Sequence, residues 1–468
     1  MTARRVLAAI APLIVSFSAG CATVGKDYQR PAITLPSAVA PPSAGQTPAA
    51  AESLALQPWS AVFADDALRD LIAAALAHNL DLRVAAARLQ QVEATYGITR
   101  SAQFPSIDAQ AVAQGQRSSV GRDEASTGGV VQLGASASWE IDFWGRYRRA
   151  TEAARAEILA TRWGQRAVIA SVVARVASGY HALRSLDAEL AIAERTLGSR
   201  EESLRLTEVR ERGGATSLVD VRQAEQLVYG ARAAITDLRS RIAQQEHALS
   251  VLVGQLPGPI TRAASSAATP ALSPVIPAGL PSDLLEQRPD VQQAEQLIVA
   301  ANADVGVARA NYFPRISLTG SGGVASSALS ALFSGPALAW TAAASAVQPL
   351  FNAGRTRSQV ALAEARREEA EAVYQQTIQQ AFRDVADALV DFQRARELRD
   401  TRERLVVAAR DAQRLAQLRY EGGVASYLEV LDSDTRLFAA ELDLVRTGLD
   451  EQQAFVDAYR ALGGGWRN

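Results

Sequence analysis

The chain has 468 residues, and its 48 lysines and arginines nearly balance 50 aspartates and glutamates, which leaves a formal net charge of -2 at pH 7. This balance gives no indication of nucleic-acid binding or of a polybasic membrane patch. Cys21 is the only cysteine, so no disulfide can form within one chain. Stability in an oxidising compartment must therefore come from packing or from the assembly of several chains.

The inventory of reactive side chains does not indicate an enzyme. Lys26 is the only lysine, and it lies outside any phosphate-binding G-x-x-x-x-G-K-[ST] motif, while no serine stands in a G-x-S-x-G elbow. The histidines His78, His181 and His247 lie far apart and have no cysteine or histidine partner at ligand spacing. We therefore expect them on helix surfaces and predict no metal site.

The first residues predict a secretory signal of the lipoprotein type. Arg4 and Arg5 precede an uncharged, almost wholly apolar run at 6–17, which is shorter than the roughly 20 residues of a membrane-spanning helix. The run ends in Ser18-Ala19-Gly20-Cys21, which resembles a bacterial lipoprotein box. We predict a signal peptide at 1–20 and a covalent lipid on Cys21, with no other cofactor. The alternative is an ordinary signal peptide beside an incidental cysteine.

An internal duplication organises the rest of the chain. Four landmarks recur at one constant displacement of 209 residues: Asn79-Leu80-Asp81-Leu82 with Arg288-Pro289-Asp290-Val291, Phe104-Pro105 with Phe313-Pro314, Gly145-Arg146 with Gly354-Arg355, and Gly213-Gly214 with Gly422-Gly423. The predicted organisation is a lipidated extended segment at 21–65, a first repeat at 66–255, a Pro/Ser/Ala-rich linker at 256–281, a second repeat at 282–463 and a tail at 464–468.

Each repeat begins with a helix and continues into a β-hairpin. The helices are predicted at about 66–102 and 290–312, and the pairs Phe104-Pro105 and Phe313-Pro314 mark the boundaries from helix to strand. Apolar and polar residues then alternate, as is typical of strands that are apolar on one face and polar on the other. The hairpins are expected at about 105–142 and 314–350.

The strands have the length of tilted strands that cross a membrane, about ten to twelve residues. Trp139 and Trp340 are predicted at the two membrane interfaces. The uncharged stretch between Arg315 and Arg355 leaves a transmembrane helix as an alternative, but Pro336 and several glycines interrupt it. Two hairpins supply only four strands, and membrane barrels have eight or more, so the chain is expected to assemble.

A long helical hairpin completes each repeat. Apolar residues recur every three or four positions over more than a dozen turns, for example from Ala370 to Leu415, with no proline or glycine between them. About 60 residues at 1.5 Å each predict a rod of roughly 90 Å. The rods turn back at Gly213-Gly214 and Gly422-Gly423 and return to about 253 and 462. A structural coiled-coil lipoprotein would explain the rods but not the hairpins.

This arrangement resembles the TolC-like outer-membrane efflux factors, within them the lipoprotein branch that serves multidrug efflux pumps. The likeness covers nearly all of the mature chain and depends on "VGKDYQRP", "LLEQRPDVQQAE", "ARANYFPRISLTGSGG", "FNAGRTRSQV" and "YEGGVASYLEVLDSDTRLF" in this order. It implies a mixed, mainly α fold in which three chains close a twelve-stranded β-barrel in the outer membrane, and twelve helices continue it as a periplasmic α-barrel. It also implies a periplasmic adaptor and an inner-membrane pump as partners.

The resemblance further implies a gate where the second rod turns back. Leu428, Glu429 and Asp432 are spaced three and four apart and share one helical face, and Arg436 follows Asp432 by four residues. Members of the family usually place the arginine three residues after the aspartate, where this chain has Thr435, so the partner of the gate acids stays open. The alternative is that these acids only favour the positive end of their helix and the solvent.

The function predicted from this resemblance is a passive outer-membrane duct for drugs or small solutes, with the hairpin loop around Asp123 on the cell surface. A channel for type I protein secretion is the alternative, and the lipoprotein box and the "RPDV" run favour efflux. The sequence does not identify the transported substrates.

Overall fold

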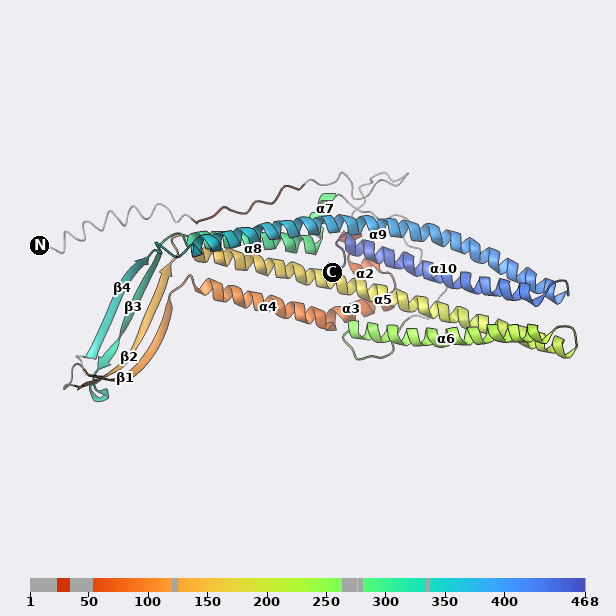
Figure 1. Ribbon diagram of the computed structural model, residues 1–468, viewed down its shortest axis with the longest axis horizontal. Coiled ribbons are helices and arrows are strands. Elements are labelled where there is room, and N and C mark those ends of the chain that lie inside the picture. The colour runs from red at the N-terminus through yellow and green to blue at the C-terminus, as the bar shows by residue number, and fades with distance from the viewer. Residues whose placement is uncertain are drawn as a thin grey trace. The chain divides into compact units, whose positions relative to one another are not determined.

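The computed structural model describes residues 23–33, 54–119, 125–262, 276, 281–333 and 337–467. It confirms a mainly helical fold with one four-stranded antiparallel sheet (Figure 1). Two compact units divide the chain. The strand unit holds the described residues of Met1–Ala32, Arg88–Arg162 and Gln293–Gln375, and the hairpin unit holds those of Ile33–Ala87, Trp163–Gln292 and Gln376–Asn468.

The predicted rods are present in both repeats. Helices α5 (Arg146–Arg212) and α9 (Arg355–Glu421) have 67 residues each, and α6 (Leu218–Leu252) and α10 (Tyr427–Ala461) have 35 each. Figure 1 shows α6 returning along α5 and α10 returning along α9. Helices of this length depend on the packing of an apolar stripe along their whole course, because propensity alone contributes little.

The prediction of one continuous helix over 66–102 is wrong. Helix α3 (Asp66–His78) ends at Asn79, whose backbone is extended, and α4 (Leu80–Ser101) begins directly after it. The Asn79 side chain accepts a hydrogen bond from the Leu82 amide at 3.2 Å and donates one to the Leu252 carbonyl at 2.8 Å. It therefore caps α4 and also binds the last turn of α6, which the helical sequence pattern does not reveal.

Arg288 occupies the equivalent break in the second repeat, between α7 (Pro281–Gln287) and α8 (Pro289–Ala310). Its guanidinium donates to the Ala461 carbonyl of α10 at 2.9 Å, as Asn79 does to the equivalent carbonyl of α6. It also binds Asp290 at 2.7 Å and Asp384 at 3.3 Å. Through the Arg288 side chain, which is only 9% exposed, the "RPD" motif thus connects α8 with the other helices of the second repeat.

The sheet runs in the order β1-β2-β3-β4, and every neighbouring pair is antiparallel. The strands are β1 (Ser106–Ser119), β2 (Ala125–Ile141), β3 (Arg315–Ser326) and β4 (Leu338–Val347). The two repeats meet where β2 pairs with β3, from Val131 opposite Ser326 to Ile141 opposite Ile316. A short 3-10 turn, η2 (Leu329–Ala331), precedes β4.

The hairpin unit has the larger core. It packs α3, the short elements η1 (Leu54–Leu56) and α2 (Trp59–Val62), and the middle of α5 against α9 and α10. Tyr459 donates to the Gln57 carbonyl at 2.8 Å, and burial raises its pKa to about 12. Ala461 and Leu462 near the C-terminus belong to this core. Beyond them, the Trp466 ring meets Trp163 edge-on with ring centroids 5.8 Å apart.

His181 departs from the expectation of three surface histidines. His78 and His247 are exposed, whereas His181 is partly buried on α5. Burial lowers its pKa to about 4, against the opposing effect of Asp65, while Arg184 lowers it further. Among the described residues, no helix combines the length and the apolar character that crossing a membrane requires.

Candidate channel wall and gate

One face of the sheet is apolar except toward the loops, where Arg117 of β1 and Ser326 of β3 share it. The register places these side chains opposite one another across all four strands: Ile107, Ala109, Ala111 and Ala113 in β1; Val131, Leu133, Ala135, Ala137, Trp139 and Ile141 in β2; Ile316, Leu318, Gly320, Gly322 and Val324 in β3; and Leu338, Trp340, Ala342, Ala344 and Ala346 in β4. Alternation along each strand and the pairing between strands therefore agree, as a strand period of two requires.

The opposite face is mostly polar, although Val112, Val130 and Val347 also lie on it, and hydrogen bonds connect neighbouring strands across it. The hydroxyl oxygens of Ser106 and Ser138 lie 2.9 Å apart, those of Ser317 and Ser345 2.9 Å, and those of Ser321 and Thr341 2.8 Å. Further polar side chains of this face are Asp108, Gln110, Gln114, Gln132, Ser136, Glu140 and Thr319. Such a face suits water, whereas the apolar face suits hydrocarbon.

The sheet has two unpaired edges. Neither the outer edge of β1 nor that of β4 meets another described strand. Every residue of β4 is exposed. Unpaired strand edges are templates for further strands, and they do not persist in lipid.

The Phe-Pro pairs lie where the sequence places them, between helix and strand. Phe104-Pro105 separates α4 from β1, and Phe313-Pro314 separates α8 from β3. Trp144 stacks on Phe313 with ring centroids 4.6 Å apart, and its indole donates to the Pro314 carbonyl at 2.8 Å. This junction is thus held by specific contacts.

Trp139 and Trp340 both lie on the apolar face, at different levels of the sheet. Trp139 is opposite Leu318 near the helical ends of the strands, and its indole donates to the Gln103 carbonyl at 3.0 Å. Trp340 is opposite Gly322, closer to the loops, and is 76% exposed. Their place at two membrane interfaces stays a prediction.

The double glycines form the turns of both helical hairpins. Gly214 and Gly423 have φ values of +71° and +72°, which suit glycine. The Ala215 amide donates to the Arg210 carbonyl at 2.8 Å, and the Val424 amide donates to the Arg419 carbonyl at 3.0 Å. Gly213 and Gly422 precede them and complete the same C-terminal motif in each repeat.

The predicted gate residues lie on an exposed face of α10, directly after the second turn. Leu428 is 58% exposed. Asp432 pairs with Arg436 at 2.9 Å, and Glu429 pairs with Arg419 at 3.3 Å. The structure thus supplies an arginine to each acid within one chain; the role of these residues as a gate stays a prediction.

A buried polar cluster beside the gate residues was not predicted from the sequence. Arg200 of α5 pairs with Asp434 of α10 at 2.7 Å, and their side chains are only 6% and 14% exposed. Arg200 also donates to the Leu227 carbonyl of α6 at 3.1 Å. Nearby, Tyr427 approaches Ser203 at 3.3 Å between the hydroxyl oxygens. The one signal in the sequence is Asp434, an acid four residues after the apolar Val430, which is buried in the structure.

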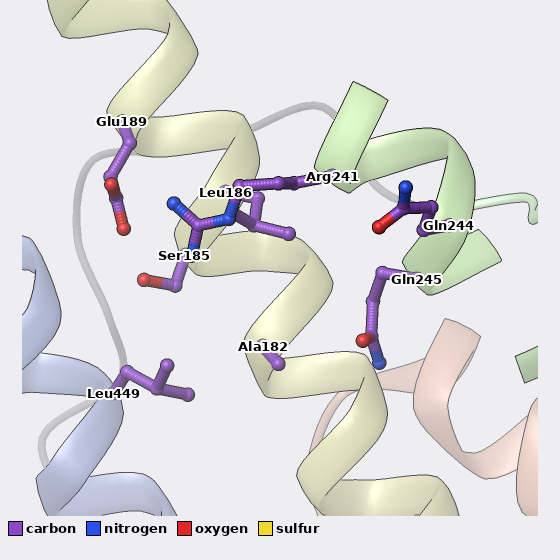
Figure 2. A pocket seen from close by; sticks show the side chains of 8 residues that line it. All are labelled: Ala182, Ser185, Leu186, Glu189, Arg241, Gln244, Gln245 and Leu449. Atoms are coloured by element: carbon purple, nitrogen blue, oxygen red, sulfur yellow. The ribbon is translucent and has the colours of Figure 1, made fainter. Parts of the chain in front are cut away.

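Farther along the same helices, a polar cavity of about 270 Å³ lies between α5, α6 and α10 (Figure 2). The Glu189 carboxylate is 3% exposed and pairs with Arg446 at 3.0 Å. The Ser185 hydroxyl is buried and has no hydrogen-bond partner in the described part of the chain. In that same part, no cluster of three or more His, Cys, Asp or Glu side chains is arranged to hold a metal ion.

Residues 23–33, called the strap below, form an extended segment, and residues 23–32 of it pack within the strand unit. The Val24 amide donates to the Trp144 carbonyl at 3.0 Å, and Asp27 pairs with the buried Arg149 at 2.8 Å. The Arg30 guanidinium donates two hydrogen bonds to the Glu295 carboxylate, at 2.7 and 2.6 Å. The "VGKDYQRP" motif is therefore a docking segment; Cys21 itself lies outside the described residues.

Comparison with known proteins decides the family. A model of the outer membrane efflux protein family matches residues 71–255 and 280–464. This chain belongs to that family. The solvent efflux pump outer membrane protein SrpC of Pseudomonas putida is 39% identical over 455 residues, which cover 96% of each chain. The cation efflux system protein CusC of Escherichia coli (strain K12) is 34% identical and covers 97% of this chain and 98% of its own.

Solved structures of the family share the fold of this outer membrane efflux protein. A crystal structure of CusC has a TM-score of 0.84 and 33% identity, and it covers 95% of this chain and all of that one (100%). The open-state outer membrane channel MtrE of Neisseria gonorrhoeae has a TM-score of 0.83 and 29% identity, covering 95% and 99%. The family model matches the chain twice, at 71–255 and at 280–464, so the chain holds two copies of the family's unit.

Proposed function

We propose that three copies of this chain form a passive duct through the outer membrane, which carries drugs or other small solutes out of the cell. The duct would complete a tripartite system with a periplasmic adaptor and an inner-membrane pump. The observation that supports this most is the sheet, which has one apolar face, one polar face and two unpaired edges. A sheet of this kind is stable when its edges pair with further copies, its apolar face meets lipid and its polar face meets water.

Assembly follows from the strand order. Because β1 and β4 are the edges, the β4 edge of one copy pairs with the β1 edge of the next, and three copies close a ring of twelve strands. The number three comes from the family likeness, since four strands per copy are also compatible with a ring of two copies. The polar face then lines a water-filled passage.

The duct has no energy source in its own chain. The sequence has one lysine and no phosphate-binding motif, so the driving force would come from the pump. In this proposal Leu428, Glu429 and Asp432 narrow the closed duct, Arg436 holds Asp432, and a lipid on Cys21 attaches each copy to the inner leaflet.

Adjacent residues on opposite faces of β2 provide a matched test. Ala135 lies on the apolar face and Ser136 on the polar face. An arginine on the lipid side of such a sheet destabilises it by about 2–4 kcal/mol near the bilayer centre. We expect Ala135→Arg to reduce the amount of trimer in the outer membrane strongly, while Ser136→Arg inserts like the parent. Equal insertion of both variants, or loss of Ser136→Arg alone, would contradict the assignment of the two faces.

A further inference from the structure

A groove in the strand unit combines apolar and acidic side chains and has no role in the proposed function so far described. It lies between α5, α8 and α9 and has a volume of about 420 Å³, within the size range of small-molecule sites. Its floor and walls are mostly apolar, with Leu297, Ala300 and Ala301 from α8 and Leu362 from α9. Two carboxylates, those of Asp304 and Glu157, also line it.

The acids of the groove are not neutralised by direct contacts. No described side chain donates a hydrogen bond to Asp304 or forms an ion pair with Glu157. Partial burial raises the pKa of the Asp304 carboxyl, and repulsion from Glu157 raises it further, while Arg366, which also lines the groove, lowers it. The groove therefore combines apolar walls with two carboxylates that have no direct ion-pair partner among the described residues.

The groove faces away from the strap. On α8 the strap contacts Glu295, Asn302 and Gly306, where Asn302 donates to the Lys26 carbonyl at 3.0 Å. At 100° per residue, Ala300 and Asp304 point to the opposite side of the helix.

Helices α5 and α9 of the same chain both contact α8. Arg149 of α5 packs against Gly306, and Arg309 pairs with Glu364 of α9 at 2.6 Å. Glu157 of α5 and Leu362 of α9 also line the groove, so α8 lies between these two helices.

We propose that this groove is a duct-facing site for organic cations that carry an apolar body, one site per copy. The inference depends on the proposed function, because the strap begins two residues after the predicted lipid on Cys21 and so lies on the lipid side of the wall. The opposite face then looks into the duct. The apolar walls contact the apolar body of the ligand. Asp304 and Glu157 attract its positive charge, and the bound cation then neutralises these carboxylates.

Current block in planar bilayers tests this site. The probe is benzyltrimethylammonium, and benzenesulfonate is the charge-reversed counterpart, both added to the purified full-length trimer. We expect the cation to block the parent more strongly than the anion does. Asp304→Asn and Glu157→Gln should each weaken the cation block about threefold, as for exposed charge pairs. Arg366→Gln should strengthen it, which a merely structural role would not produce.

Two controls keep the outcomes distinct. Asp237→Asn removes an exposed acid of α6 outside the groove and should leave the block unchanged. Ala301→Cys places a thiol in the groove, and its reaction with a membrane-impermeant methanethiosulfonate should lower the current. Parental block in Asp304→Asn, or modification of Ala301→Cys without a change in current, would overturn the site while the duct stands. Absence of any current from inserted parent trimers would instead refute the duct.

Discussion

The buried pair between Arg200 and Asp434 should dominate the stability of the paired helical hairpins near their turns. In Arg200→Met a side chain of similar length replaces the guanidinium, and Asp434, only 14% exposed, keeps its charge without a partner. Removing one member of a buried pair destabilises a protein by about 3–5 kcal/mol. The Leu227 carbonyl also loses its donor. We therefore expect a loss of about 4 kcal/mol in the free energy of unfolding.

Thermal and urea unfolding followed by circular dichroism measure this effect on purified trimers. The double variant Arg200→Met with Asp434→Leu removes the stranded charge and should recover most of the loss, because well-packed apolar replacements of buried pairs are often neutral. Arg436→Met is the exposed control; its pair with Asp432 is 76% and 58% exposed and should contribute less than about 1 kcal/mol. If Arg200→Met loses no more stability than Arg436→Met, or if the double variant is as unstable as Arg200→Met alone, the buried pair does not stabilise the hairpins as proposed.

The gate, the anchor and the partly buried His181 give three further predictions. Leu428→Ala with Asp432→Ala should raise single-channel conductance and sensitise cells to vancomycin; parental conductance at equal trimer abundance would show that this face does not line the constriction. Cys21→Ser should abolish incorporation of labelled palmitate, and normal acylation of the variant would exclude the lipid anchor. The neutral form of His181 is favoured in the folded chain, so stability should fall by up to about 3 kcal/mol between pH 6.5 and 4. His181→Gln should flatten that slope, and an unchanged slope would assign it to other groups.

The sheet and the rods were predictable because their signals are periodic. Alternation in β2 and the constant displacement between the repeats predict which residues share a face, and pairing from Ile107 opposite Ala137 onward follows the same alternation. The turns at Gly214 and Gly423 were predictable because positive φ strongly favours glycine. These features depend on local geometry, which a sequence carries directly.

The break at Asn79 and the cluster around Arg200 were not predictable in the same way. Asn79 interrupts a helix through a bond to Leu252, and Arg200 meets Asp434 from another helical hairpin. Both contacts join residues far apart in sequence, and polar residues in helical patterns look like solvent-facing positions until their partners are known. The strap motif shows the same limit, since its partner Glu295 lies in the second repeat, 265 residues after Arg30.

Single-channel recording of the purified trimer in planar bilayers tests the central claim most directly. We expect uniform stepwise currents from the parent. We also expect a smaller cation current through Ser136→Arg, because that position lies on the polar face that lines the passage. Trimers that insert into the bilayer yet carry no current, or a Ser136→Arg current equal to the parent's, would contradict a duct lined by this face of the sheet.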